Sequence, residues 1–343
     1  MSERDVIAAD RARSAAGPFF EDLHIGQVAQ GAPALTLTAG HAAVHQAIVG
    51  DRLRLPLDAT LSARVLGGGA GPLAHPALVC DVAIGQSTLL TQRVIANLFY
   101  RGLVLRRAPV IGDTLRTTTE VVALRQNNPR EGRAATGLAV LRIRTTDQEG
   151  RRVLDFWRCA MLPLRDPAGT TGHADDLDAI PAEIDGRVVH DAVADWDLAA
   201  FADAVPGAHA AGLVEGTRWT VEGGDVVSAA PELARLSLNI ATAHHDETGP
   251  SGRRLVYGGH TIGLAAAQLT RALPNLVTIV AWHGCDHVGP VFEGDTLSSG
   301  VALEAVEPLS QGGALVHLRS RVWASRGHEQ ADVLDWRPVG VMA

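Results

Sequence analysis

Alternating hydrophobic and polar residues predict two sets of three β-strands, one set in each half of the chain. Valine, leucine and threonine are frequent in these runs, and such residues favour strands. Short polar turns separate consecutive runs, so each set should form an antiparallel meander. The predicted strands cover residues 114–124, 137–146 and 151–164 in the first set and 296–306, 314–325 and 331–342 in the second.

Each meander is preceded by an apolar, helix-compatible segment that follows a cluster of glycines. In the first half the glycine-rich stretch 67–71 leads into residues 72–89. In the second half Gly258 and Gly259 lead into residues 261–273. One long helix against one antiparallel sheet, repeated, is an α+β arrangement.

Three pairs of similar segments recur in the same order along the chain. The clearest pair shares a Gly-Asp-Thr-Leu turn, and the second shares Val-Leu-Asp followed by an aromatic residue. The separation is about 180 residues each time, which indicates two copies of one fold in tandem. The pairs are 109–115 with 290–297, 153–156 with 333–336, and, more loosely, 35–40 with 219–224.

The repeat divides the chain into an expected N-terminal unit at 18–165 and an expected C-terminal unit at 198–343. Residues 1–17 carry charges and no long apolar core, which excludes a secretory signal and favours a mobile tail. Residues 166–197 are rich in Asp, Ala, Gly and Pro and predict a linker. Its apolar residues that could pack onto a surface are Ile180, Ile184 and Val188.

The composition and net charge limit the classes of binding partner and the cellular compartment that we expect. The chain has 343 residues and a formal net charge of -8, without Lys/Arg-rich runs, so neither nucleic acid nor an anionic membrane is an expected partner. No run reaches the roughly 18 apolar residues of a membrane helix. Cys80, Cys159 and Cys285 are odd in number and far apart, as in a reducing cytoplasm. We therefore expect a soluble cytoplasmic protein.

The candidate chemistry lies between residues 236 and 260. Asn239 and His244 share a polar segment, and Gly258 and Gly259 stand before the second predicted helix. An imidazole can exchange a proton near neutral pH, and N–H groups at a helix start can bind a developing oxyanion. These parts suit adding water next to a carbonyl. The plainer alternatives are that His244 is an ordinary polar loop residue and that the two glycines form only a tight turn before the helix.

Four further residues near this segment could contact a ligand. Tyr257 and His260 flank the glycine pair and either line a pocket or pack in the core. Arg253 and Arg254 suit CoA phosphates or a substrate carboxylate, because a guanidinium binds such groups in two-pronged fashion; a surface arginine pair is the alternative.

Two neighbouring patterns remain open. His245 and Asp246 follow the candidate base directly; in an extended segment His245 should point away, whereas Asp246 could orient the imidazole. His283, Cys285 and His287 alternate and would share one face of a strand, which a metal could use. Gly284 and the lack of a fourth ligand favour packing or pocket lining, so no metal site is expected.

The ordered set of motifs resembles the MaoC-like double hotdog hydratases, most closely the mesaconyl-CoA hydratase (β-methylmalyl-CoA dehydratase) group. The matching pieces, besides the Gly-Asp-Thr-Leu turns, are residues 19–27, 95–98, 153–156 and 253–260. This resemblance implies a tandem hotdog fold, in which each unit wraps an antiparallel sheet around a helix, with a CoA thioester bound between units.

The family carries a Gly-Asp-x-Asn-Pro-x-His motif, and each copy here departs from it. The first copy keeps Asp51 but has Pro56 in place of the histidine. The second keeps His244 but has Asn239 in place of the aspartate, as the mesaconyl-type branch does. The resemblance therefore implies one working site, in the second copy.

The implied activity is reversible hydration of an α,β-enoyl-CoA, with mesaconyl-CoA or a similar short dicarboxylyl-CoA as first candidate. His244 would be the acid/base, Asn239 would orient water or the ring, and the glycine amides would bind the thioester oxygen. No cofactor is expected, because CoA is part of the substrate, and a homo-oligomer is compatible with the sequence. The rivals are a hotdog thioesterase, which Asn239 disfavours, and a non-catalytic acyl-CoA binding protein.

Overall fold

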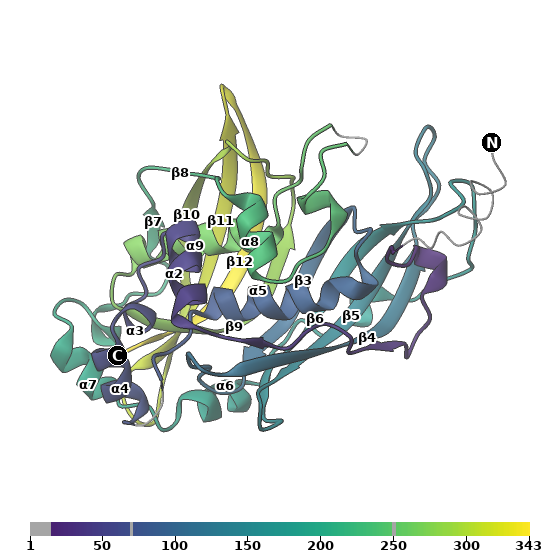
Figure 1. Ribbon diagram of the computed structural model, residues 1–343. Helices are drawn as coiled ribbons and strands as arrows, with labels where there is room; N and C mark the ends of the chain where they lie inside the picture. The colour runs from purple at the N-terminus through teal and green to yellow at the C-terminus, as the bar shows by residue number, and fades with distance from the viewer. Residues whose placement is uncertain (1–14, 69–70, 249–251) are drawn as a thin grey trace.

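A computed structural model describes residues 15–68, 71–248 and 252–343; most of the predicted tail and part of the glycine stretch 67–71 lie outside these ranges. Within the described residues, twelve strands form one sheet (Figure 1). The strands are β1 (Val28–Ala29), β2 (Leu35–Thr36), β3 (Ala96–Leu105), β4 (Thr114–Gln126), β5 (Thr136–Thr146), β6 (Arg152–Pro163), β7 (Arg218–Thr220), β8 (Asp225–Val226), β9 (Leu276–His287), β10 (Thr296–Pro308), β11 (Ala314–Arg326) and β12 (Glu329–Met342).

The two predicted meanders are present as β4–β5–β6 and β10–β11–β12, and the α+β double hotdog expectation is confirmed. Two long strands were not predicted. β3 pairs with β6 and β9 pairs with β12, and β3 also pairs with β9 in antiparallel register, with Tyr100 opposite Cys285. This central pair joins both halves into the order β1-β4-β5-β6-β3-β9-β12-β11-β10-β7, with β2 on β4 and β8 on β10.

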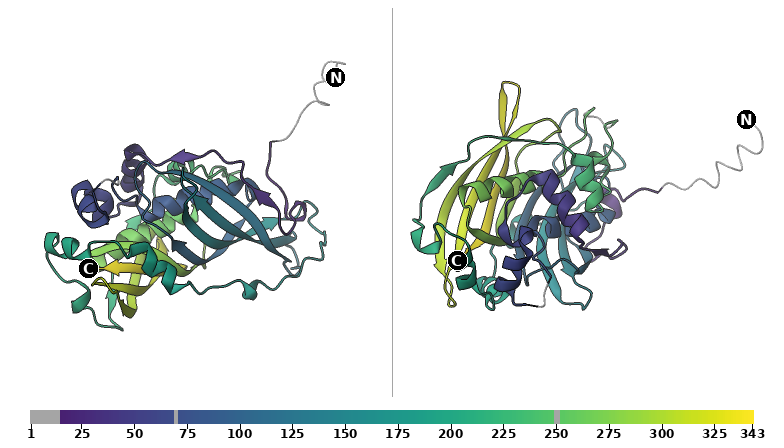
Figure 2. Two further views of the ribbon diagram at one scale, coloured as in Figure 1. Left: turned by 90° about the horizontal axis from the view of Figure 1, so that it is seen from below. Right: turned by 60° about the vertical axis from the view of Figure 1, so that its left-hand side comes forward.

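Two helices, α5 and α9, lie against each other on one side of the sheet, which curves around them (Figure 1, Figure 2). Every residue of α5 is buried, so it is the central helix of the first half. The helices are α2 (Ala39–Val49), α3 (Arg54–Leu57), α4 (Ala59–Leu66), α5 (Pro76–Gln86), α6 (Gly186–Val193), α7 (Leu198–Ala204), α8 (Ala230–Leu236) and α9 (Gly258–Ala272), with 3-10 turns η1 (Phe20–Asp22), η2 (Ser87–Leu90), η3 (Leu177–Ala179), η4 (Ala210–Gly212) and η5 (Thr242–His244).

Each central helix is tied to the first strand of its meander by a buried glutamine. Gln86 Nε2 donates to the Leu115 carbonyl at 3.0 Å, and Gln268 Nε2 donates to the Leu297 carbonyl at 2.8 Å. Each amide thus satisfies a backbone oxygen inside the core, where an unpaired one would be costly. The two bonds also fix which residues of α5 and α9 correspond.

The repeated Gly-Asp-Thr-Leu turns have a structural role. Asp113 accepts the Val110 N–H at 2.9 Å and pairs with Arg107, and Asp295 accepts the Phe292 N–H at 2.9 Å and pairs with Arg326. In both copies the carboxylate closes the turn that starts the meander, which explains why the motif recurs.

Residues 166–197 form more structure than the predicted linker. Ile180, Ile184 and Val188 pack against the core, partly buried. Helix α6 contacts both β3 and β9, and its last residue, Val193, is buried, as is Trp196 just after it. No helix of the described residues combines the length and apolarity needed to cross a membrane.

Candidate active site

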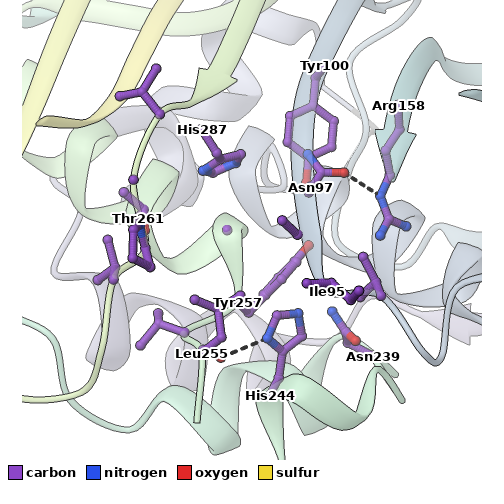
Figure 3. A pocket seen from close by; sticks show the side chains of 18 residues that line it. Ile95, Asn97, Tyr100, Arg158, Asn239, His244, Leu255, Tyr257, Thr261 and His287 are labelled. Carbon is purple, nitrogen blue, oxygen red and sulfur yellow. Dashed lines mark hydrogen bonds between the residues drawn. The ribbon is translucent and has the colours of Figure 1, made fainter. Parts of the chain in front are cut away.

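A cavity of about 290 Å³ opens beside the N-terminal end of α9 (Figure 3). Its walls come from β3 and β6 of the first half and from the segments at 239–244, 255–261 and 287–291 of the second half. The site is therefore shared by both copies of the repeat. No Asp or Glu lines it within the described ranges.

The loop that carries Asn239 is docked onto the end of α5. A Cβ at Gly85 would collide with the carbonyl of Ser237, so only glycine lets the loop approach this closely. Thr88 Oγ1 accepts the Ile240 N–H at 3.1 Å, and Leu238 has a φ of 61°, which side-chain-bearing residues rarely adopt. The first half thus holds the loop in a strained conformation.

His244 presents one ring nitrogen to the cavity. It ends the 3-10 turn η5, and its Nδ1 lies 2.8 Å from the carbonyl oxygen of Leu255. A carbonyl oxygen can only accept, so Nδ1 carries the proton and donates it. Nε2 then keeps its lone pair, and this nitrogen faces the cavity (Figure 3).

The electrostatic surroundings keep His244 neutral. Burial lowers the pKa of His244 to about 4, and the nearby positive charge of Arg158 adds to this effect. Burial also lowers the pKa of the cavity-lining His287 to about 4. At neutral pH both rings are uncharged, and His244 can accept a proton.

Asn239 is buried and shapes the same loop. Its Oδ1 accepts the Ala241 N–H at 2.9 Å, so the amide nitrogen is the end on the cavity side (Figure 3). Its backbone carbonyl oxygen lies 2.6 Å from His245 Nε2. A donor that cannot titrate therefore stands beside the His244 base.

The start of α9 explains the glycine pair. Gly258 lines the cavity, and the first N–H groups of a helix have no intrahelical acceptor. A Cβ at Gly258 would lie 2.7 Å from the His287 ring, and one at Gly259 would overlap the Asp81 carboxylate. The glycines are thus required by the packing of the protein itself, and Gly258 also faces the ligand space.

The other sequence-predicted residues divide into two groups. Tyr257 lines the cavity, with its ring centroid 5.5 Å from that of His244. His260 is fully buried in α9 and does not line the cavity. Neither Arg253 nor Arg254 lines it: Arg254 pairs with Glu293 and Glu247, and Arg253 packs over the ring of Phe292.

The extended conformation expected for His245 and Asp246 is wrong, because the chain turns at η5. Asp246 accepts bonds from Thr248, so the carbonyl of Leu255, and not this carboxylate, orients His244.

The expected common face of His283, Cys285 and His287 is also wrong. The β9–β12 register shifts between Trp282 and Gly284, and this irregularity reverses the alternation. His283 stacks on His317 outside the cavity, whereas His287 lines it. Within the described ranges no three His, Cys, Asp or Glu side chains are grouped to hold a metal.

Sequence reasoning missed three polar residues of the first half that line the cavity: Asn97, Tyr100 and Arg158. Asn97 belongs to the segment 95–98, which resembles the family but gave no indication of a role for this residue. Arg158 stood inside an apolar run, where a charged residue is unusual, and this was a readable signal.

The equivalent place in the first copy is closed. Asp51 is buried, accepts the Leu53 N–H at 2.6 Å, and lies 3.1 Å from His75 Nε2. Beside the start of α5 only about 10 Å³ remains, and Trp196 lines this residual space. In the first copy, the segment between the copies therefore fills the volume that corresponds to the open cavity of the second copy.

The chain is similar to two proteins of known activity. No family model matches the chain. The chain is 31% identical over 299 residues to the β-methylmalyl-CoA dehydratase of Chloroflexus aurantiacus, covering 83% of this chain and 82% of that protein. It is 31% identical over 321 residues to the mesaconyl-CoA hydratase of Cereibacter sphaeroides, covering 89% and 88%.

Solved structures show the same architecture. A double hotdog protein of Mycobacterium tuberculosis is 53% identical, with a TM-score of 0.86 over 95% of this chain and 99% of that one. A MaoC-domain dehydratase of Chloroflexus aurantiacus is 26% identical, with a TM-score of 0.83 over 96% and 99%. The resemblance of the motifs is thereby confirmed. The chain belongs to the MaoC-like double hotdog hydratases and dehydratases and is an enzyme of the hydro-lyase class.

Proposed function

We propose that this enzyme reversibly hydrates an α,β-enoyl-CoA thioester, with His244 as acid/base and mesaconyl-CoA or a similar short dicarboxylyl-CoA as substrate. The observation that carries the proposal is the bond from His244 Nδ1 to the Leu255 carbonyl, which leaves the lone pair of Nε2 in the cavity. The names of the relatives in Chloroflexus and Cereibacter support the substrate class.

The proposed reaction uses only side chains and backbone of this chain. His244 Nε2 takes a proton from water while the water oxygen bonds to the β-carbon, and the electrons of the double bond move onto the thioester oxygen. The N–H groups at the start of α9 bind that oxygen. The imidazolium then returns its proton to the α-carbon, so that one water is added in total; the reverse sequence removes it.

Asn239 has a positioning role in this scheme. Its amide group donates to the attacking water or to the substrate, while its oxygen holds the loop. No carboxylate lines the cavity within the described ranges, whereas a hotdog thioesterase usually uses one to activate water against the thioester carbonyl. We propose that no cofactor besides the CoA of the substrate is needed.

The test follows the conjugated absorbance of mesaconyl-CoA and crotonyl-CoA with purified protein. We expect loss of absorbance without release of free thiol, and a decrease of roughly 10²-fold or more for His244→Ala, the range for a general acid/base. His283→Ala is the matched control, because this half-buried histidine lies outside the cavity. Thiol release would indicate a thioesterase, and binding without any turnover would indicate a binding protein. Near wild-type rates in His244→Ala would contradict its role.

A further inference from the structure

The cavity contains one permanently charged side chain, Arg158 of β6. The residue is 3% exposed. Its Nε donates to Asn97 Oδ1 at 2.8 Å and its Nη1 donates to Ser87 Oγ at 2.9 Å. Both partners are neutral, and they hold the guanidinium so that its outer end projects toward the space shared with His244 and Asn239 (Figure 3).

Arg158 has no counter-charge in the described part of the chain. It forms no ion pair there, whereas the buried carboxylates Asp113, Asp155 and Asp295 are each paired with an arginine. A guanidinium stays charged at every physiological pH. Leaving such a charge buried without a partner is costly, so its place is explained best by an anionic group that arrives with the ligand.

The two copies of the repeat differ at this point. Arg158 lies opposite Tyr100 on β3, and the corresponding pair in the second copy is Pro338 opposite Trp282 on β9. In the same alignment Asn97 corresponds to Ile279, because each lies three residues before that aromatic residue.

The second acceptor, Ser87, differs between the copies in the same way. The glutamines that tie α5 and α9 to the sheet correspond, so the residues after them, Ser87 and Leu269, also correspond. The guanidinium and both of its acceptors therefore occur only in the copy whose side chains face the open cavity. The equivalent positions around the closed site are Pro, Ile and Leu, so the fold itself does not require this polar set.

We propose that Arg158 binds a free carboxylate at the far end of the acyl group and thereby selects dicarboxylyl thioesters over plain aliphatic ones. The inference rests on the proposed function only in placing the thioester in this cavity. In an enoyl thioester of this class the second carboxylate is attached to the β-carbon. The thioester would lie near Gly258 and His287, the carboxylate near Arg158, and the double bond between them within reach of His244 (Figure 3).

The direct test measures binding by calorimetry of succinyl-CoA and butyryl-CoA, which differ in a terminal carboxylate or methyl group. Wild-type protein should bind succinyl-CoA at least 10-fold more tightly. Arg158→Gln should weaken succinyl-CoA binding by roughly 10- to 100-fold, the range for bonds to a charged group, and change butyryl-CoA binding less than about 3-fold. Arg152→Gln is the matched control on the same strand, because the exposed Arg152 pairs with Asp155 and does not line the cavity.

Three results would overturn the inference. The first is that wild-type protein binds the two ligands equally well, and the second is that Arg158→Gln still prefers succinyl-CoA. The third is that Arg158→Gln loses affinity for both ligands equally, which would mean that Arg158 binds the CoA moiety or stabilises the fold. If the glutamine variant does not fold, Arg158→Lys replaces it in the test. This variant keeps the charge without the planar fork and should retain part of the preference for succinyl-CoA. Selective binding without hydration of any enoyl-CoA would refute the proposed function and leave this inference intact.

Discussion

His260 allows the cost of a buried, unpartnered imidazole to be measured. It lies in the first turn of α9, it is 0% exposed, and neither ring nitrogen has a hydrogen-bond partner among the described residues. Burial lowers the pKa of His260 to about 4, and of the neighbouring charged groups Glu293 raises it slightly while His45 lowers it. His260→Leu removes the titrating group and puts an apolar side chain of similar size in its place.

The sign of the pH effect follows from the folded pKa lying below the unfolded one. Between pH 6.5 and 4 the unfolded chain binds a proton at this site and the folded protein does not, so stability falls as the pH falls. At about 1.4 kcal/mol per pKa unit, lowering the pKa from 6.5 to about 4 corresponds to about 3 kcal/mol in total, of which about 2 kcal/mol is lost by pH 5.

Urea unfolding at pH 7.5 and pH 5.0 tests this directly. At pH 7.5 His260→Leu should be as stable as wild type or more stable, since the unpartnered nitrogens are gone. The advantage of the variant should grow by about 2 kcal/mol at pH 5.0. The exposed His328, changed to Leu, is the control and should show no such growth. An advantage of equal size at both pH values would refute the assigned pKa.

Two further predictions concern the open and the closed site. Because burial lowers the pKa of His244 to about 4, kcat/KM for hydration should stay level from pH 7.5 to 5 and fall only as the pH approaches 4; a fall centred near 6.5 in a pH–rate profile would contradict this. Trp196→Ala should destabilise the protein by about 3–5 kcal/mol in urea unfolding, as loss of a buried indole does, without raising turnover per chain. A loss below about 1 kcal/mol would show that the indole does not fill the closed site.

The meanders were predictable because their signal is local. Alternation, polar turns and the recurring Gly-Asp-Thr-Leu sequence all lie within a few residues, and Asp113 and Asp295 show that the motif closes the same turn in both copies. β3 and β9 were not predicted, because neither shows a regular alternation. Residues 276–282 of β9 form a nearly continuous apolar run, which does not distinguish a strand from a helix, and Asn97 and Arg101 interrupt the apolar residues of β3. Their pairing joins distant segments, which periodicity does not report.

The candidate site was predictable where one short segment carries it. Asn239, His244, Tyr257 and Gly258 lie close in sequence and all line the cavity. What orients His244 could not be deduced, because the carbonyl of Leu255 is a backbone group that is brought close only by the loop fold. Arg158 was missed for a related reason: whether a charged residue in a strand faces the core depends on register, and the β3–β6 register contains shifts.

The two copies of the repeat supply different parts of the one open site. The groups proposed to move protons and bind the thioester, His244 and the start of α9, come from the second copy. The loop holding Asn239 is shaped by Gly85 and Thr88 of the first copy, which also supplies Arg158. The first copy therefore contributes to the open site although its own site is closed. Its strands line one side of the open site and its helix end positions the Asn239 loop, so neither copy builds this site alone.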